Sequence, residues 1–145
     1  MTFMRWLFVC GTVLLLGMRG AVGFEAGHIL VGEVRIIDGD TLEIAGSRVR
    51  LNGLAAPERD ESGGPEATEF MKRLTAGQVV KCSLTGDKTY EREVGTCWIG
   101  TVDVAAALIA AGLARDCPRF SGGRYSALEP DAARKLPFPR YCQPR

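Results

Sequence analysis

The order of strand-like and helix-like segments most limits the folds open to this chain. Residues 29–37 are rich in branched apolar side chains, a composition typical of a β-strand. Residues 41–44 and 47–51 continue in strand-like fashion, and residues 38–39 and 45–46, each pair ending in glycine, separate the runs as tight turns. We therefore expect a three-stranded meander early in the fold.

An amphipathic helix is expected after this meander. Pro65 is suited to its first turn and Gly77 to its end. One apolar stripe has helical spacing and consists of Ala67, Phe70, Met71 and Leu74. A polar, glycine-containing loop at residues 59–64 separates this helix from the meander.

The second half of the chain predicts two more strands and one or two further helices. The strands are expected at residues 79–84 and 93–99. An apolar stripe then predicts a helix from residue 104 to residue 111, with Gly112 ending it. A third helix is expected at residues 125–135, although Pro130 lies in its middle.

Five short strands with one helix between the third and the fourth have the order of an OB-type barrel. The expected class is therefore α+β and mainly β: a five-stranded OB-type barrel with two to three helices. Such a fold carries many unrelated functions, so it does not fix an activity.

The first residues are expected to be a targeting segment. Residues 6–18 are almost wholly apolar, follow a positive charge and precede small residues that end at Gly23. This pattern is typical of a secretory signal peptide over residues 1–23, and the run is shorter than the roughly 20 residues of a membrane span. We expect cleavage near Gly23, a secreted or periplasmic location, no membrane attachment, a domain at residues 24–136 and an extended tail at 137–145.

Four cysteines lie beyond this segment, and an even number in an exported chain favours two disulfides. Three pairings are possible. Cys82 and Cys97 lie in two strand-like runs separated by a turn, which favours Cys82–Cys97 and leaves Cys117–Cys142 to tie down the tail. A zinc site is the rival interpretation, but the chain has no C-x-x-C and only one histidine, His28.

Three short polar motifs are candidates for chemistry. Asp38 and Asp40 flank a turn glycine and offer oxygen ligands to a hard cation, although Asp-Gly is also a common hairpin turn. Arg50 on a strand is suited to hold a phosphate, and Glu58 after it to take a proton from water. Arg92 enters a later strand. Singly, each motif has a plain structural explanation.

Together, in their order and strand context, these motifs resemble the thermonuclease, or staphylococcal-nuclease-like, family. The resemblance runs from about residue 30 to about residue 129 and consists of residues 37–41, Arg50 with residues 57–58, Tyr90 with Arg92, and residues 106–114. It implies a calcium-dependent phosphodiesterase on an OB-type barrel that cleaves DNA and RNA. We expect a monomer.

The resemblance also assigns roles. Asp40 matches the first calcium-binding aspartate of the family, and Asp38 a neighbouring aspartate that supports the metal site. Arg50 matches the first phosphate-clamping arginine. Glu58 matches the glutamate usually assigned to water activation, and Arg92 the second arginine, which stabilises charge in the transition state.

The chain departs from the family pattern at one metal ligand. Where the family has an aspartate two residues before the proline, this chain has Ala55, whose methyl group cannot bind calcium. The neighbouring carbonyl ligand remains available from Ala56. Because cation affinity follows the number of charged ligands, calcium binding is expected to be weakened. Tyr90, Phe120 and Lys88 are expected to contact the substrate, Phe120 by stacking on a base.

Two other functions remain open. Net charge is only +1, so no overall basic field indicates a nucleic-acid partner, although residues 111–145 hold seven basic and three acidic side chains. Ala55 favours a non-catalytic OB-fold module that binds nucleic acid or another anionic ligand through Arg50, Arg92 and the basic C-terminal part. A disulfide-stapled structural or partner-binding domain also fits the near-neutral charge.

Overall fold

The computed structural model describes residues 28–144, and the signal peptide expected at residues 1–23 lies outside this range. The described strands are β1 (Ile29–Gly32), β2 (Val34–Ile36), β3 (Thr41–Ile44), β4 (Ser47–Leu51), β5 (Leu54–Ala55), β6 (Val80–Thr89), β7 (Arg92–Ile99), β8 (Val102–Asp103) and β9 (Arg115–Asp116). The α-helices are α1 (Gly64–Thr75), α2 (Val104–Ala110) and α3 (Pro118–Ser121), and short 3₁₀ turns are η1 (Ser126–Leu128), η2 (Ala133–Lys135) and η3 (Arg140–Cys142).

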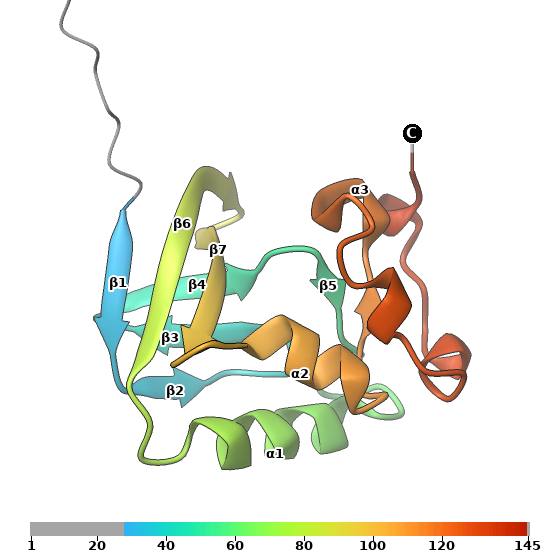
Figure 1. Ribbon diagram of the computed structural model, residues 1–145, viewed down its shortest axis with the longest axis horizontal. Coiled ribbons are helices and arrows are strands. Elements are labelled where there is room, and N and C mark those ends of the chain that lie inside the picture. The colour runs from blue at the N-terminus through green and yellow to red at the C-terminus, as the bar shows by residue number, and fades with distance from the viewer. Residues whose placement is uncertain (1–27, 145) are drawn as a thin grey trace, which may run out of the picture.

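The main sheet curls back on itself. Its strands follow the order β1-β6-β7-β4-β3-β2, and a single residue, Glu33, separates the two end strands β1 and β2 along the chain. The two ends of the sheet therefore meet, and the sheet forms the barrel-like layer seen in Figure 1. The pairing of β4 with β7 is parallel, with Arg50 opposite Val94, and the other pairings are antiparallel. The expected OB-type α+β fold is confirmed.

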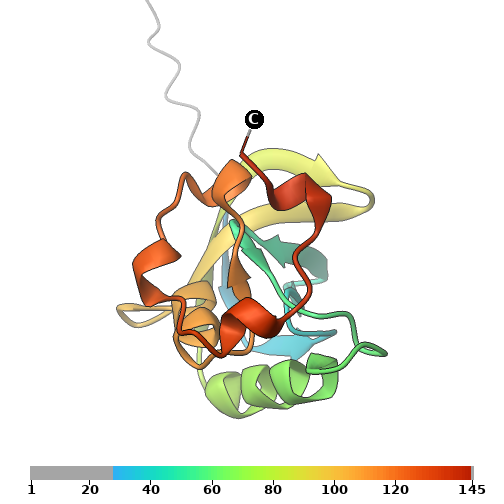
Figure 2. The ribbon, with the colours of Figure 1, turned by 90° about the vertical axis from the view of Figure 1, so that its right-hand side faces the viewer.

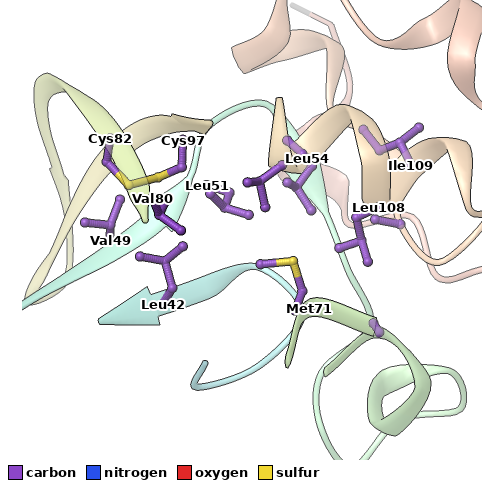
Figure 3. Packing of buried hydrophobic residues seen from close by; sticks show 14 of the residues in the cluster. Leu42, Val49, Leu51, Leu54, Met71, Val80, Cys82, Cys97, Leu108 and Ile109 are labelled. Atoms are coloured by element: carbon purple, nitrogen blue, oxygen red, sulfur yellow. A yellow bond between two sulfur atoms is a disulfide. The ribbon is translucent and has the colours of Figure 1, made fainter. Parts of the chain in front are cut away.

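The barrel encloses the main hydrophobic core. Helix α1 contributes Ala67 and Met71 to it, and α2 contributes Leu108 and Ile109, all fully buried. Cys82 and Cys97 lie directly opposite each other on β6 and β7 and form a disulfide inside this core (Figure 3). In the described part of the chain, none of the helices has the length and apolar character that crossing a membrane requires.

The last part of the chain lies against one end of the barrel. Strand β5 leaves the main sheet and pairs with β9, with Ala55 opposite Arg115. From β9 onward the chain forms only short elements, which lie together beside α2 when the molecule is turned (Figure 2). A second disulfide, Cys117–Cys142, joins the start of α3 to η3.

Several expected elements differ from the observed ones. The first expected strand is divided at Glu33 into β1 and β2, which allows one stretch of chain to pair with β6 and with β3. The prediction of a helix at residues 125–135 is wrong, because the chain forms the short turns η1 and η2 there instead. Pro130, which has no backbone N–H to donate, lies between them. Helix α3 was not anticipated, and the expected extended tail contains η3.

Candidate active site

A cavity of about 460 Å³ opens at the end of β4 and beside the β6–β7 hairpin. It brings together four of the residues singled out in the sequence, which are Asp40, Arg50, Glu58 and Arg92. These residues come from a turn, a strand, a loop and a second strand that are far apart in sequence. The other lining residues are Leu51, Asn52, Gly53, Leu54, Thr89, Tyr90, Val94, Phe120 and Tyr141.

A tight turn before β3 positions Asp40. The backbone N–H of Asp40 donates to the Asp38 carboxylate at 3.0 Å, so Asp38 supports the turn and does not line this cavity. A Cβ on Gly39 would lie 2.7 Å from that of Ala56 and 2.9 Å from that of Ala67, closer than two carbons can approach. Glycine at position 39 therefore allows the turn to lie directly against Ala56.

Asp40 is a buried carboxylate with positive neighbours. Arg50 Nη2 lies 3.1 Å from its Oδ2, and Arg92 Nη1 lies 3.9 Å from its Oδ1, which also accepts a 2.8 Å hydrogen bond from the Thr41 hydroxyl. Burial raises the pKa of Asp40 to about 6, although Arg50 opposes this rise. The charged form of Asp40 is thus less stable than that of an exposed aspartate, and additional positive charge would stabilise it.

The two arginines are held in place by backbone and hydroxyl oxygens. Arg50 Nη1 donates to the carbonyls of Leu51 (3.1 Å) and Leu54 (3.3 Å), while Nη2 faces Asp40. Arg92 Nη1 donates to the Thr41 hydroxyl at 3.0 Å. Both guanidinium groups therefore have fixed orientations toward the cavity, and this preorganisation is what bidentate recognition of a phosphate requires.

Glu58 lies on the loop between β5 and α1. Its backbone N–H donates to the Glu61 carboxylate at 2.9 Å, and its carbonyl accepts from the Glu61 backbone N–H at 2.9 Å. A Cβ on Gly64 would lie only 1.8 Å from the Glu58 carbonyl oxygen, so glycine at this helix start lets the loop fold closely. The Glu58 side chain is exposed, and within residues 28–144 it forms no salt bridge.

The cation ligands expected from the sequence are incomplete. Asp40 supplies a carboxylate to the cavity, and the Ala56 side chain lies against the turn that holds Asp40, although Ala56 is not among the residues that line the cavity. Ala55, only 2% exposed, packs instead on the Cys117–Cys142 disulfide and Phe138. No cluster of three acidic, histidine or cysteine side chains suited to a metal occurs between residues 28 and 144. The oxygen donors fit a hard cation, but with fewer charges than calcium sites usually provide.

The expected substrate contacts are divided between two places. Tyr90, with a positive φ of 54° at the hairpin tip, and Phe120 of α3 both line the cavity. Lys88 lies outside the cavity lining, and its ammonium group pairs with Glu93 across the hairpin at 2.9 Å.

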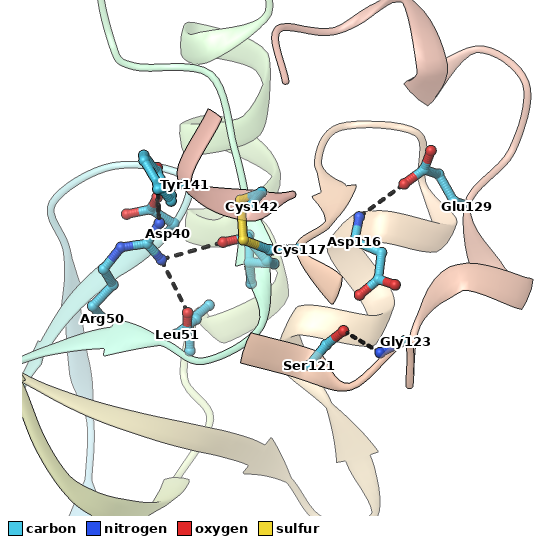
Figure 4. The surroundings of a disulfide bond; sticks show 11 residues. Asp40, Arg50, Leu51, Asp116, Cys117, Ser121, Gly123, Glu129, Tyr141 and Cys142 are labelled. Carbon is cyan, nitrogen blue, oxygen red and sulfur yellow. Dashed lines mark hydrogen bonds and ion pairs between the residues drawn. A yellow bond between two sulfur atoms is a disulfide. The ribbon is translucent and has the colours of Figure 1, made fainter. Parts of the chain in front are cut away.

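Sequence reasoning missed Tyr141. The residue lies on η3, lines the cavity, and accepts a hydrogen bond from Arg50 Nη2 at 3.4 Å (Figure 4). It directly precedes Cys142, whose bond to Cys117 brings η3 against α3. The signal was available, since the expected Cys117–Cys142 pairing already places residue 141 near Phe120.

Comparison with known proteins gives consistent results. Residues 48–134 match the family described as staphylococcal nuclease homologues. The chain is 36% identical over 119 residues to the succinoglycan biosynthesis protein ExoI of Rhizobium meliloti (strain 1021), covering 74% of this chain and 62% of that protein. It is 34% identical over 86 residues to a protein of Escherichia coli O157:H7 named uncharacterized endonuclease, covering 56% of each.

A second Escherichia coli protein with the same name is also 34% identical over 86 residues. The chain thus spans about three fifths or less of the length of these relatives. The matched family region includes Arg50, Glu58 and Arg92, and the barrel has the arrangement that the sequence resemblance implied. The chain therefore belongs to the family of staphylococcal nuclease homologues.

Proposed function

We propose that this protein is a nuclease that hydrolyses phosphodiester bonds of DNA, RNA or both. Membership of the nuclease family and relatives named endonucleases support the activity class. The observation that carries the proposal is the convergence of two oriented guanidinium groups and the exposed Glu58 carboxylate on one cavity.

In this proposal Arg50 and Arg92 bind the non-bridging oxygens of the scissile phosphate. Their positive charge stabilises the additional negative charge that develops on these oxygens in the transition state. Glu58 takes a proton from the attacking water as the new P–O bond forms. The P–O bond to the leaving group then breaks, and the departing alkoxide is protonated by solvent.

Asp40 and the Ala56 carbonyl are the residues that we propose would hold a divalent cation, with Asp38 fixing the Asp40 turn. Such a cation would add positive charge beside the phosphate and offset the burial of Asp40. Because Ala55 supplies no carboxylate, we expect weaker calcium affinity than two aspartates would give.

We also propose that the protein is a monomer and that it acts outside the cytoplasm; the N-terminal sequence pattern and the two disulfides support the export. Disulfides persist mainly in exported proteins, because cytoplasmic thiols are kept reduced. Cleavage of residues 1–23 would be measured by intact mass after expression with export.

Cleavage of labelled single-stranded DNA and RNA tests the proposal, with calcium added in one arm and a chelator in the other. The wild-type protein should cleave, whereas Glu58→Ala and Arg92→Ala should lose cleavage while remaining folded. Glu69→Ala is a matched control, since Glu69 lies on the exposed side of α1 and pairs with Lys72.

The second candidate is a module that binds nucleic acid without cleaving it, and Ala55 is the observation that favours it. Binding of the same oligonucleotides with no cleavage under either condition would support the module and exclude the enzyme.

A further inference from the structure

The C-terminal strap, residues 138–142, brings a side chain to the cavity from the far end of the sequence. Tyr141 is followed by Cys142, which is covalently bound to Cys117 at the start of α3. Helix α3 and η3 pack against each other, and Phe138 packs on the same disulfide. Tyr141 is therefore held beside Arg50 by a covalent anchor one residue away (Figure 4).

Two aromatic rings line the cavity from this anchored pair of turns. Tyr141 is 48% exposed and Phe120 is 52% exposed, so part of each ring is open to a ligand. Each ring has an exposed arginine beside it in sequence, Arg140 and Arg119. Aromatic faces next to cations are the usual means of binding a nucleobase together with its phosphate.

We propose that Tyr141 is a substrate-binding residue whose ring packs on a nucleobase adjoining the phosphate held by Arg50. This inference rests on the proposed nuclease function and extends it to a residue outside the matched family region. The Tyr141 hydroxyl lies 3.4 Å from Arg50 Nη2, near the outer limit of a hydrogen bond. This contact is therefore weak, and its loss costs little when Arg50 binds a phosphate.

The test measures binding without cleavage. Fluorescence anisotropy in a chelator would compare a labelled short oligothymidylate with an oligonucleotide of equal length whose bases are replaced by abasic tetrahydrofuran units. Tyr141→Ala should bind the oligothymidylate about tenfold more weakly than wild type does, and the abasic oligonucleotide with unchanged affinity, because only the oligothymidylate has bases that can stack on the tyrosine ring. Tyr141→Phe, which keeps the ring, should bind both within about twofold of wild type.

Leu128→Ala is the control, because Leu128 is an exposed apolar side chain on η1 that does not line the cavity. Equal weakening for both oligonucleotides in Tyr141→Ala would overturn the inference, since it would mean a general structural effect. So would a loss of oligothymidylate binding in Tyr141→Phe as large as in Tyr141→Ala, which would make the hydroxyl, and not the ring, the group that binds. If the wild-type protein binds neither oligonucleotide, the proposed function itself fails. If the wild-type protein binds the oligothymidylate and both Tyr141 variants bind it equally well, only the inference about Tyr141 fails.

Discussion

The barrel (residues 28–114) and the C-terminal segment (residues 115–144) are held together in different ways. The barrel buries a continuous set of apolar side chains between its sheet, α1 and α2. The C-terminal segment buries few residues, which are Asp116, Cys117, Tyr125, Ala133 and Cys142. Each of its elements has four residues or fewer.

Specific polar contacts take the place of a core in the C-terminal segment. Arg115 pairs with Glu129 at 3.2 Å and lies 4.3 Å from the ring centre of Phe138. The Tyr125 hydroxyl donates to Asp103 at 2.8 Å, and Asp103 also caps α2. Such contacts fix individual side chains, whereas distributed burial makes a whole region cooperative. The segment is therefore suited to position residues at the cavity, and the barrel to carry the proposed chemistry.

The largest expected effect separates catalysis from binding. Glu58→Gln should reduce cleavage by about 10²–10⁴-fold, because the amide cannot accept the proton from water. Oligonucleotide affinity should stay near the wild-type value, since Glu58 is assigned no role in holding the phosphate. Single-turnover cleavage and anisotropy measure the two quantities. A parallel loss of affinity would place Glu58 in substrate binding and contradict its assignment as the base.

Removing one disulfide should destabilise a different part of the molecule from removing the other. The double variant Cys82→Ser with Cys97→Ser should lower the free energy of unfolding by about 3 kcal/mol, as the chain-entropy model gives for a loop of this length. The double variant Cys117→Ser with Cys142→Ser should instead open the C-terminal segment locally, because that segment has little core of its own.

Hydrogen exchange with peptide resolution would distinguish the two variants, each serving as the control for the other. Faster exchange confined to residues 115–144 is expected only when Cys117–Cys142 is missing. Exchange that rises throughout the barrel in that variant would show that both regions form one cooperative unit.

The hydrogen bond from Tyr125 to Asp103 joins the two regions, and Tyr125→Phe should lower the free energy of unfolding by about 1–2 kcal/mol at neutral pH. Burial, followed by the bond to Asp103, raises the pKa of Tyr125 above its ordinary value of 10.0. The unfolded chain therefore releases this proton first, and stability falls as the pH rises above about 10.

Urea unfolding between neutral and alkaline pH would measure this effect as the difference between wild type and Tyr125→Phe, which cancels the titration of other groups. The difference should shrink as the pH rises above 10.0, the ordinary pKa of the tyrosine. A constant difference would mean that the hydroxyl is not the titrating group.

The smallest expected effect concerns Ala55, which lies where the two regions meet. Ala55→Asp places a charge against a disulfide and Phe138 and should lower the melting temperature without calcium. Added calcium should then raise the melting temperature more than in wild type, because position 55 matches the place where the family has a calcium-binding aspartate. The control is Ala55→Asn, whose side chain has nearly the same volume as aspartate without the charge, so calcium should raise its melting temperature no more than that of wild type. Equal effects of calcium on the two variants would place the cation elsewhere.

Sequence patterns predicted the barrel because its strands and helices have periodic burial. The stripe of Ala67 and Met71 and the alternation along residues 47–51 both follow from one face packing on a core. The same patterns failed for residues 125–135, where Pro130 interrupts the backbone hydrogen bonds and individual contacts decide the conformation. The cavity residues Asp40, Arg50, Glu58 and Arg92 were identified from their motifs, but Tyr141 has no local pattern.

The position of Cys117–Cys142 matters for anyone who prepares this protein. Material made in a thiol-reducing host would lack Cys82–Cys97 within the barrel as well as the covalent link between α3 and η3. Peptide mapping without reductant would distinguish such a preparation from the oxidised one. Batches should therefore be sorted by their oxidation state before their affinities are compared.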